Sequence, residues 1–331
     1  MPLKVGIPRA LLYYYYYPLW RTFFTELGAE VVLSQPSNKG ILEAGLQKAV
    51  DEVCFPVKLA YGHVLDLADK ADLIFLPRLV SVAKREYVCP KFMGLPDMIR
   101  RIKGLPPLID PCINFNKGNL DLSRRVQEAG RLLGVSNHRV WLSYLKASKI
   151  QARYVKLLRQ GFLPPEALET LKNSDQVAPT NKHKKNGAMS IAVLGHPYNI
   201  YDSFASMNLI ERLQNMGANI VAAEALREQT VKDSAARYLS KKLFWTLGRR
   251  MVGAAFDYME RRAVTGIVHV AAFGCGPDSM TGELIERHAR LMGIPFLNIT
   301  LDEHTAEAGL LTRLEAFMDM LRWREAGAAY V

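Results

Sequence analysis

The four cysteines are the residues of this 331-residue chain whose types and surroundings point most directly to chemistry. Each has a proline within two positions, as the sequence reads at Cys54-Phe-Pro56, Cys89-Pro90, Pro111-Cys112 and Cys275-Gly-Pro277. With proline at about 5% of residues, chance alone would give this arrangement about once in a thousand sequences. Proline and glycine hold a loop open and reduce the number of competing N–H groups, as a loop that presents a thiolate to a metal requires.

The spacing of the cysteines leaves the kind of site open. No C-x-x-C pair occurs, and the four residues lie far apart along the chain. Zinc and iron–sulfur clusters both accept thiolates, but structural zinc sites usually take their ligands in local pairs. Three thiolates from distant segments suit a four-iron cluster that keeps one iron open for a substrate. Buried, inert cysteines are the alternative.

The segments that must position these cysteines recur within the chain. Three Gly-anchored turns reappear at one constant offset: Gly6-Ile7-Pro8 as Gly195-His196-Pro197, Leu27-Gly28-Ala29 as Met216-Gly217-Ala218, and Gly104-Leu105-Pro106 as Gly293-Ile294-Pro295. Agreement of three separate turns in one register is hard to obtain by chance. We therefore predict two copies of one unit.

Each copy alternates short apolar runs with helical signals, which is typical of a parallel sheet covered by helices on both faces. We expect strands near 3–7, 29–33, 72–76, 107–109, 190–194, 219–223, 266–271 and 295–299. We expect helices near 41–50, 57–68, 95–102 and 306–322. Pro18 is expected to open the first helix, with Tyr13 to Tyr17 packing its entry. Residues 120–172 have helical periodicity and no strand signal. The predicted organisation is a lobe at 1–120, a helical insert and linker at 121–186, and a second lobe at 187–331.

Ligands of such sheets bind beyond the carboxyl ends of the strands. Cys89, Cys112 and Cys275 all fall in segments of this kind. His196 does too, and it is a candidate proton donor, with an ordinary loop histidine as the alternative. Asp278 is expected to cap a helix that begins near Met280.

Composition narrows the function further. The chain has 43 Lys+Arg against 32 Asp+Glu, a formal charge of +11. Its basic clusters lack interleaved aromatic residues and no helix-turn-helix or zinc-finger spacing occurs, so nucleic acid is not expected as a partner. The charge fits an anionic cofactor or an acidic partner better. Candidate contacts, against simple surface solvation, are Arg9, Lys58, Arg78 and Lys91.

Three motifs that the sequence lacks lead to expectations about the cellular location of the protein and about ATP hydrolysis. No apolar stretch reaches the roughly 20 residues that a bilayer requires, so we expect no membrane span. The start of the chain has no signal-peptide pattern, and we expect a cytoplasmic protein. No G-x-x-x-x-G-K-[ST] motif occurs, so ATP hydrolysis would belong to a partner.

Several long motifs carry a family resemblance: Gly6-Ile-Pro-Arg9, Val50-Asp-Glu-Val-Cys54-Phe-Pro-Val-Lys58, Tyr87-Val-Cys89-Pro-Lys91, Gly195-His-Pro-Tyr198, Phe273-Gly-Cys275-Gly-Pro-Asp-Ser279 and Leu301-Asp-Glu-His-Thr305. Over nearly its whole length the chain resembles an uncharacterised family named after its association with activases of CoA-substrate enzymes. The broader superfamily is similar to the subunits of 2-hydroxyacyl-CoA dehydratases, benzoyl-CoA reductases and double-cubane cluster proteins.

The resemblance implies two Rossmann-like lobes and an iron–sulfur cluster held by Cys54, Cys89 and Cys275. Cys112 lies outside the matching motifs and is an optional fourth ligand. The expected cofactor is a [4Fe-4S] cluster, with a double-cubane type as the variant. An ATP-dependent activase would feed it single electrons at low potential in an anaerobe, and pairing with a homologous chain, as a homo- or hetero-dimer, is expected.

The reaction is less defined than the cofactor. The resemblance implies reductive chemistry on an acyl-CoA, as a 2-hydroxyacyl-CoA dehydratase-like lyase or a low-potential reductase. Features that bind substrate in an established dehydratase are not identifiable. A non-catalytic electron-relay or scaffold subunit is therefore the alternative, and a zinc-stabilised or metal-free α/β binding protein is a third hypothesis.

Overall fold

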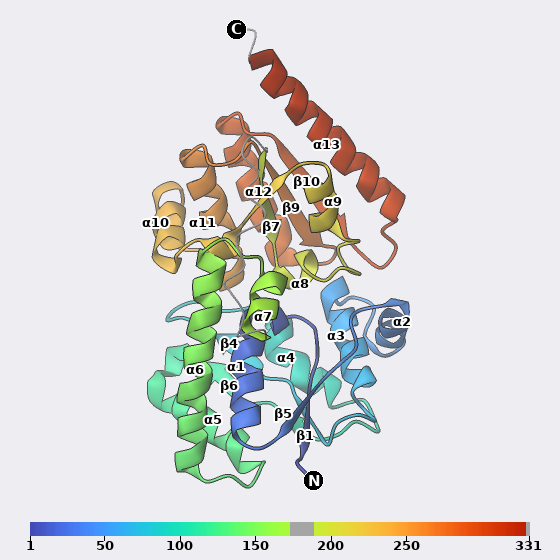
Figure 1. Cartoon of the computed structure of the whole chain (residues 1–331), viewed down its shortest axis with the longest axis vertical. Coiled ribbons are helices and arrows are strands. Elements are labelled where there is room, and N and C mark those ends of the chain that lie inside the picture. The colour runs from blue at the N-terminus through green and yellow to red at the C-terminus, as the bar shows by residue number, and fades with distance from the viewer. Residues whose placement is uncertain (173–188, 329–331) are drawn as a thin grey trace. The chain divides into compact units, whose positions relative to one another are not determined.

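The computed structural model describes residues 1–172 and 189–328, so the last part of the predicted helical insert and linker, residues 173–186, lies outside the described residues. The chain divides into two compact units. Unit 1 comprises Met1–Lys156 with Leu243–Thr246, and unit 2 comprises Leu157–Lys242 with Leu247–Val331. Helices and strands are labelled in Figure 1.

Unit 1 is built on a parallel sheet of strand order β2-β1-β3-β5. The strands are β1 (Lys4–Ile7), β2 (Glu30–Leu33), β3 (Leu73–Phe75) and β5 (Leu108–Ile109). Val5, Ile7, Ile74 and Ile109 are completely buried. A strand that is covered on both faces consists of a continuous run of apolar residues, so these strands could be predicted from the sequence.

Unit 2 repeats this topology. Its parallel sheet has the order β8-β7-β9-β10, formed by β7 (Ser190–Gly195), β8 (Asn219–Ala222), β9 (Gly266–Ala272) and β10 (Phe296–Leu301). Every residue of the central strand β9 is buried. The predicted α/β class with two parallel-sheet lobes is confirmed, and the shared strand order is what duplication of one unit would produce.

Helices connect the strands in both units. Unit 1 contains α1 (Tyr13–Glu26), α2 (Lys39–Lys48), α3 (Phe55–Asp66), α4 (Pro90–Ile99), α5 (Asn119–Arg131) and most of α6 (Asn137–Arg159). Unit 2 contains α7 (Pro164–Lys172), α8 (Pro197–Ile200), α9 (Leu209–Asn215), α10 (Glu228–Tyr238), α11 (Thr246–Glu260, whose first residue counts with unit 1), α12 (Gly276–Leu291) and α13 (Glu307–Ala328). The segment predicted to be helical without strands is α5, α6 and α7. In the part of the chain that the structure describes, no helix combines the length and apolarity needed to cross a membrane.

The expectation that Pro18 opens the first helix is wrong. Helix α1 already begins at Tyr13, and Pro18 lies inside it. Proline has no N–H for the carbonyl of the residue four positions earlier, here Tyr14. The hydroxyl of Tyr154 on α6 donates to this carbonyl at 2.6 Å, which satisfies the acceptor that the proline leaves open. Helix α6 runs beside α1, which brings the Tyr154 hydroxyl to this carbonyl (Figure 1).

A second, two-stranded parallel sheet in unit 1 was not predicted. It pairs β4 (Arg78–Ser81) with β6 (Cys112–Asn114), in a register that sets Arg78 opposite Cys112. Both strands are short and each directly follows a proline, so neither has a hydrophobic pattern long enough to be predicted as a strand. Helix α4 also begins at Pro90 rather than near Leu95, because proline fits the first helical position.

A buried histidine links α3 to the segment after β2. His63 is completely buried, with Nδ1 at 2.9 Å from Ser34 Oγ and Nε2 at 2.8 Å from Ser37 Oγ. A neutral imidazole provides one donor and one acceptor, which matches two hydroxyl groups. Burial, opposed in part by Asp66, lowers the pKa of His63 to about 4.

This histidine predicts an acid-sensitive part of the stability. The unfolded chain takes up the proton near pH 6.5 and the folded chain only near pH 4, so stability is full above pH 6.5 and falls as the pH drops toward 4. Between pH 7 and pH 5 the His63 contribution should fall by about 2 kcal/mol. Urea unfolding at both pH values should show a smaller pH dependence for His63→Gln. The exposed His138→Gln is the control, and equal pH dependence in wild type and His63→Gln would contradict the prediction.

Candidate cofactor and metal site

Three of the four cysteines share one local setting. Cys54, Cys89 and Cys275 each stand immediately before a helix, at the N-cap positions of α3, α4 and α12, and each of these helices has a proline in its first turn. The unpaired N–H groups and the dipole of a helix N-terminus favour negative charge. A thiolate, or a cluster that carries negative charge, is therefore favoured at all three positions.

In unit 1 a side-chain hydrogen bond joins two of these positions. Lys91 Nζ, two residues after Cys89, donates to the carbonyl oxygen of Glu52, two residues before Cys54, at 3.1 Å. The structure thus brings the Cys54 and Cys89 segments together. Cys275 belongs to unit 2, so a single site that includes all three cysteines stays a prediction.

The close approach of α2 and α3 fixes the helix that follows Cys54. A Cβ atom on Gly45 would lie 2.0 Å from the Lys58 carbonyl oxygen, and one on Gly62 would lie 1.8 Å from that of Ile41. Only glycine permits this contact between two helix backbones. Helix α3, and with it Cys54, is therefore held by backbone packing.

The loop before Cys89 is held by a segment from much later in the chain. Tyr87 N donates to the carbonyl of Phe244 at 3.1 Å, and Thr246 N donates to the carbonyl of Tyr87 at 3.0 Å. The rings of Tyr87 and Phe244 stack at 4.8 Å. These contacts explain why residues 243–246 count with unit 1.

Cys112 has a different setting from the other three cysteines. It lies within β6, half-buried, and no helix begins directly after it. Arg78, its register partner, forms two hydrogen bonds with the Asp97 carboxylate at 2.6 and 2.7 Å. These bonds, with Arg100 nearby, hold the pKa of Asp97 below its usual range. The role of Cys112 as a fourth ligand stays a prediction.

The remaining cations proposed to meet an anionic ligand also contact the protein itself. Arg9 Nε donates to the carbonyl of Ser34 at 2.7 Å, and Lys91 bonds Glu52 as described. Lys58 is buried within α3. Like Arg78, they therefore have structural contacts of their own.

In unit 2 the adjacent strands β7 and β9 bring a histidine, a cysteine and an aspartate together. His196 follows β7, and Cys275 and Asp278 follow β9 at the start of α12. Their potential ligand atoms all lie within 4.8 Å of one another. Because parallel strands end at the same sheet edge, neighbouring strands deliver such residues to one place. This group of nitrogen, sulfur and oxygen donors could hold a metal ion.

The side chains of the histidine and the aspartate are in contact in the protein interior. His196 Nε2 lies 2.8 Å from Asp278 Oδ1, and both side chains are buried. Burial by itself raises the pKa of Asp278, but His196 and the N–H of Ala272, 3.3 Å from Oδ2, more than offset this and leave the pKa below its ordinary value. His196 also stacks on the ring of Tyr198 at 4.9 Å.

The expectation that Asp278 caps a helix is wrong. Helix α12 begins at Gly276, with Cys275 at the N-cap position, because Pro277 fits the first helical turn. Asp278 therefore lies inside the helix and turns to His196. The sequence did contain a signal for this pair, since both residues follow strands of one parallel sheet.

Sequence reasoning also missed buried polar groups around this pair. His269 on β9 has Nδ1 at 2.9 Å from Asn298 Oδ1, and burial lowers its pKa. Among the described residues, His196 Nδ1 and both amide atoms of Asn199 are buried and have no hydrogen-bond partner. Such groups are costly unless something bonds them, so a polar partner from outside these residues is indicated.

Comparisons with known proteins add two family matches. The family described as CoA enzyme activase uncharacterised domain matches residues 4–226, and the 2-hydroxyglutaryl-CoA dehydratase D-component family matches residues 151–321. Each match spans more than half of the chain. Curated proteins provided no significant match.

Solved structures add no argument about function. One of the similar structures is a protein from Silicibacter pomeroyi DSS-3, provisionally named a phosphosugar isomerase. It shares 13% identity, with 99% of this chain and 87% of that chain covered, and the TM-score is 0.20. A likeness of this size supports no inference about this chain.

Because His196 and Asp278 are buried together, we expect substitution of Asp278 to lower the stability of the folded chain. Asp278→Asn removes the carboxylate beside His196, and we expect the free energy of unfolding at pH 7 to fall by about 1–3 kcal/mol. Because the pKa of Asp278 is depressed in the folded chain, the loss should shrink as the pH falls below about 4. Denaturant unfolding at pH 7 and pH 3 measures both effects.

A surface aspartate provides the control for this experiment. Asp319, on α13, is 60% exposed and contacts Arg322 at 2.7 Å. Asp319→Asn should change the unfolding free energy by less than about 0.5 kcal/mol. Equal effects of the two substitutions would contradict the assignment of a buried His196–Asp278 pair.

Proposed function

Since this chain belongs to the family described as the CoA enzyme activase uncharacterised domain, we propose that it holds an iron–sulfur cluster and works in CoA-dependent redox chemistry. Its second half also matches the D-component of 2-hydroxyglutaryl-CoA dehydratase, so the chain is a dehydratase-component relative. The cluster would receive low-potential electrons from an ATP-dependent activase and deliver them to an acyl-CoA. A cytoplasmic location in an anaerobe is part of this proposal.

The observation that carries the proposal is the common setting of Cys54, Cys89 and Cys275. Three thiols at helix N-termini, each followed by a proline, form a donor set suited to a negatively charged iron–sulfur cluster. A [4Fe-4S] cluster is proposed, with a double-cubane type as the variant. Cys112 is proposed only as an optional fourth ligand because it lies in a strand.

When bound, the cluster supplies single electrons at low potential, which in the dehydratases that the chain resembles reduce the thioester carbonyl of a 2-hydroxyacyl-CoA. The chain's own contribution is a proton. Asp278 holds the His196 ring through Nε2, and Nδ1 is buried without a partner among the described residues. Protonated His196 would therefore donate from Nδ1 to a bound substrate, and neutral His196 would accept there.

Two partners complete the proposal. No P-loop motif, G-x-x-x-x-G-K-[ST], occurs in the sequence, and a separate activase would hydrolyse ATP and transfer the electron. A homologous chain would form the dimer, in line with the match to one component of a dehydratase. The formal charge of +11 suits an acidic partner or CoA phosphates.

Metal analysis of protein purified without oxygen tests the cofactor. We expect about four iron and four sulfide per chain for a single cubane. Cys54→Ala, Cys89→Ala and Cys275→Ala should each lose most of the iron, whereas Cys112→Ala should keep it. Less than about one iron per chain, or unchanged iron in Cys275→Ala, would overturn the cluster proposal.

The same samples separate the cluster from a zinc site. The group of His196, Cys275 and Asp278 is a specific reason to consider a single metal ion. Zinc that disappears in Cys275→Ala but persists in Cys54→Ala and Cys89→Ala would support that site instead of the cluster.

A second candidate is an electron-relay or scaffold subunit, which the match to a single dehydratase component favours. The cluster-loaded protein, an activase and ATP would be incubated with 2-hydroxyacyl-CoA substrates, with cluster reduction followed by EPR and products by mass spectrometry. Reduction with conversion of an acyl-CoA supports the catalytic role. Reduction without conversion supports the relay, and an intact cluster that the activase does not reduce contradicts both.

A further inference from the structure

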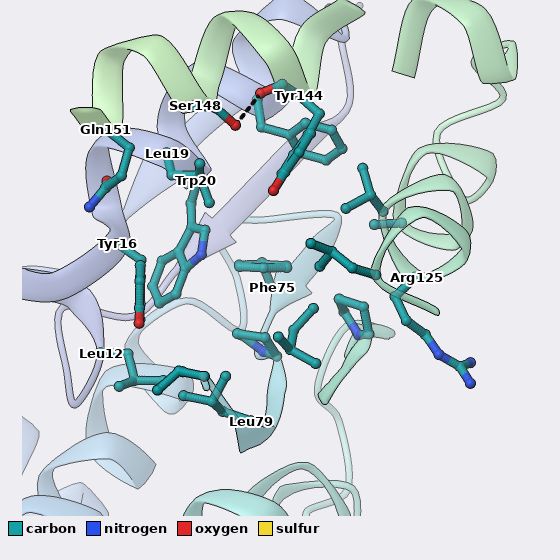
Figure 2. A pocket seen from close by; sticks show the side chains of 18 of the residues that line it. Leu12, Tyr16, Leu19, Trp20, Phe75, Leu79, Arg125, Tyr144, Ser148 and Gln151 are labelled. Carbon is teal, nitrogen blue, oxygen red and sulfur yellow. Dashed lines mark hydrogen bonds between the residues drawn. The ribbon is translucent and has the colours of Figure 1, made fainter. Parts of the chain in front are cut away.

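Unit 1 contains a cavity of about 420 Å³ that neither the cysteines nor the His196 group uses. It is lined by residues of α1, of α5 and α6, and of the ends of β3, β4 and β6 (Figure 2). Sites for small molecules typically measure about 300–1,000 Å³. Cys54, Cys89 and Cys275 do not line it.

The lining is apolar and rich in aromatic rings. The residues that define it include Leu12, Tyr16, Trp20, Phe75, Leu79 and Tyr144. Trp20 meets Phe75 edge to face, with ring centroids 5.2 Å apart. These side chains present ring faces and edges to the space, which is the environment that another aromatic ring prefers.

The polar groups of the lining are few, and protein contacts occupy most of them. Ser148 Oγ donates to the carbonyl of Tyr144 at 2.8 Å, and Gln151 Nε2 donates to the carbonyl of Tyr15 at 2.8 Å. Gln151 Oε1 is buried and accepts no hydrogen bond from the described residues, so it is a second acceptor beside the cavity. Arg125 pairs with Glu128 at 3.0 Å, and its guanidinium points away from the cavity in Figure 2. A charged ligand atom would therefore find no counter-charge inside.

The hydroxyl group of Tyr144 faces the space. The Tyr144 hydroxyl points into the cavity (Figure 2), and no residue in the described part of the chain hydrogen-bonds it. A tyrosine hydroxyl both donates and accepts, so it can bond a hydroxyl or a carbonyl oxygen of a ligand.

The walls of the cavity are held in place by contacts outside it. Tyr154 of α6 donates to the Tyr14 carbonyl beside Pro18, and Lys146 contacts Glu26 at 2.7 Å. These contacts keep α6 at a set position beside α1. A preformed apolar pocket of this size with a few polar groups is the usual form of a small-molecule site. A built space of this kind points to a ligand.

We propose that this cavity binds an uncharged aromatic molecule that carries one hydroxyl or carbonyl group, with its ring among Tyr16, Trp20 and Phe75 and its oxygen on Tyr144. The site is independent of the cluster. It makes Tyr144 the residue that recognises the polar end of the ligand.

Binding of 2-naphthol to the full-length protein tests the proposal, with naphthalene-2-sulfonate as the charged analogue. Calorimetry should show saturable 2-naphthol binding, at least tenfold tighter than that of the sulfonate. Binding should also change tryptophan fluorescence, and Trp20→Phe should abolish most of that change while calorimetric binding persists. No saturable 2-naphthol binding, or equal binding of the sulfonate, overturns the proposal.

Substitutions locate the binding. Ala129→Phe and Val126→Phe each fill the cavity from α5 and should abolish binding; circular dichroism identifies which variant is folded. Tyr144→Phe should weaken binding roughly five- to tenfold through loss of one hydrogen bond. The control Tyr238→Phe, on α10 of unit 2, should leave it unchanged. Unaltered binding in a folded Ala129→Phe or Val126→Phe variant places the ligand elsewhere and overturns the assignment.

Discussion

All strands of a parallel sheet end at the same edge, and the site in this protein depends on that constraint. In unit 2 it makes β7 and β9 deliver His196, Cys275 and Asp278 to one point although they are remote in sequence. After β7 and after β9 the chain enters a helix almost at once, at Pro197 and at Gly276. The residue at each junction lies beside unpaired N–H groups, so the backbone itself favours negative charge there. The side chains of His196 and Asp278 are in contact at this edge of the sheet.

Features that depend on local pattern were predictable from the sequence. The apolar strands were found because burial on both faces leaves continuous apolar runs, and the duplication was found because turns keep their glycines. Features that depend on distant partners were not. Pro18 could not be placed inside α1 without the Tyr154 hydroxyl that satisfies Tyr14. Asp278 looked like a cap because its partner His196 lies in another segment.

The family relation and the structure support different parts of the functional proposal. The two family matches connect the chain to CoA-dependent enzymes, and the motifs shared with their relatives suggest which cysteines hold a cofactor. The structure adds the physical reason for those positions, which is the helix N-terminus after each cysteine. It also separates Cys112, held in a strand, from the other three. Neither the family matches nor the cysteine positions predict the apolar cavity of unit 1.

The short segment 243–246 hydrogen-bonds Tyr87 and belongs to unit 1. The first half of the chain therefore cannot complete its fold until this segment of the second half has been synthesised. A ribosome makes the Cys89 loop long before it makes Phe244, so the loop emerges without the strand-like partner and the stacked ring that hold it. The first half can therefore form its sheet early but can complete its cysteine loop only after most of the chain exists. Such an order favours insertion of the proposed cluster after translation, into a nearly finished protein.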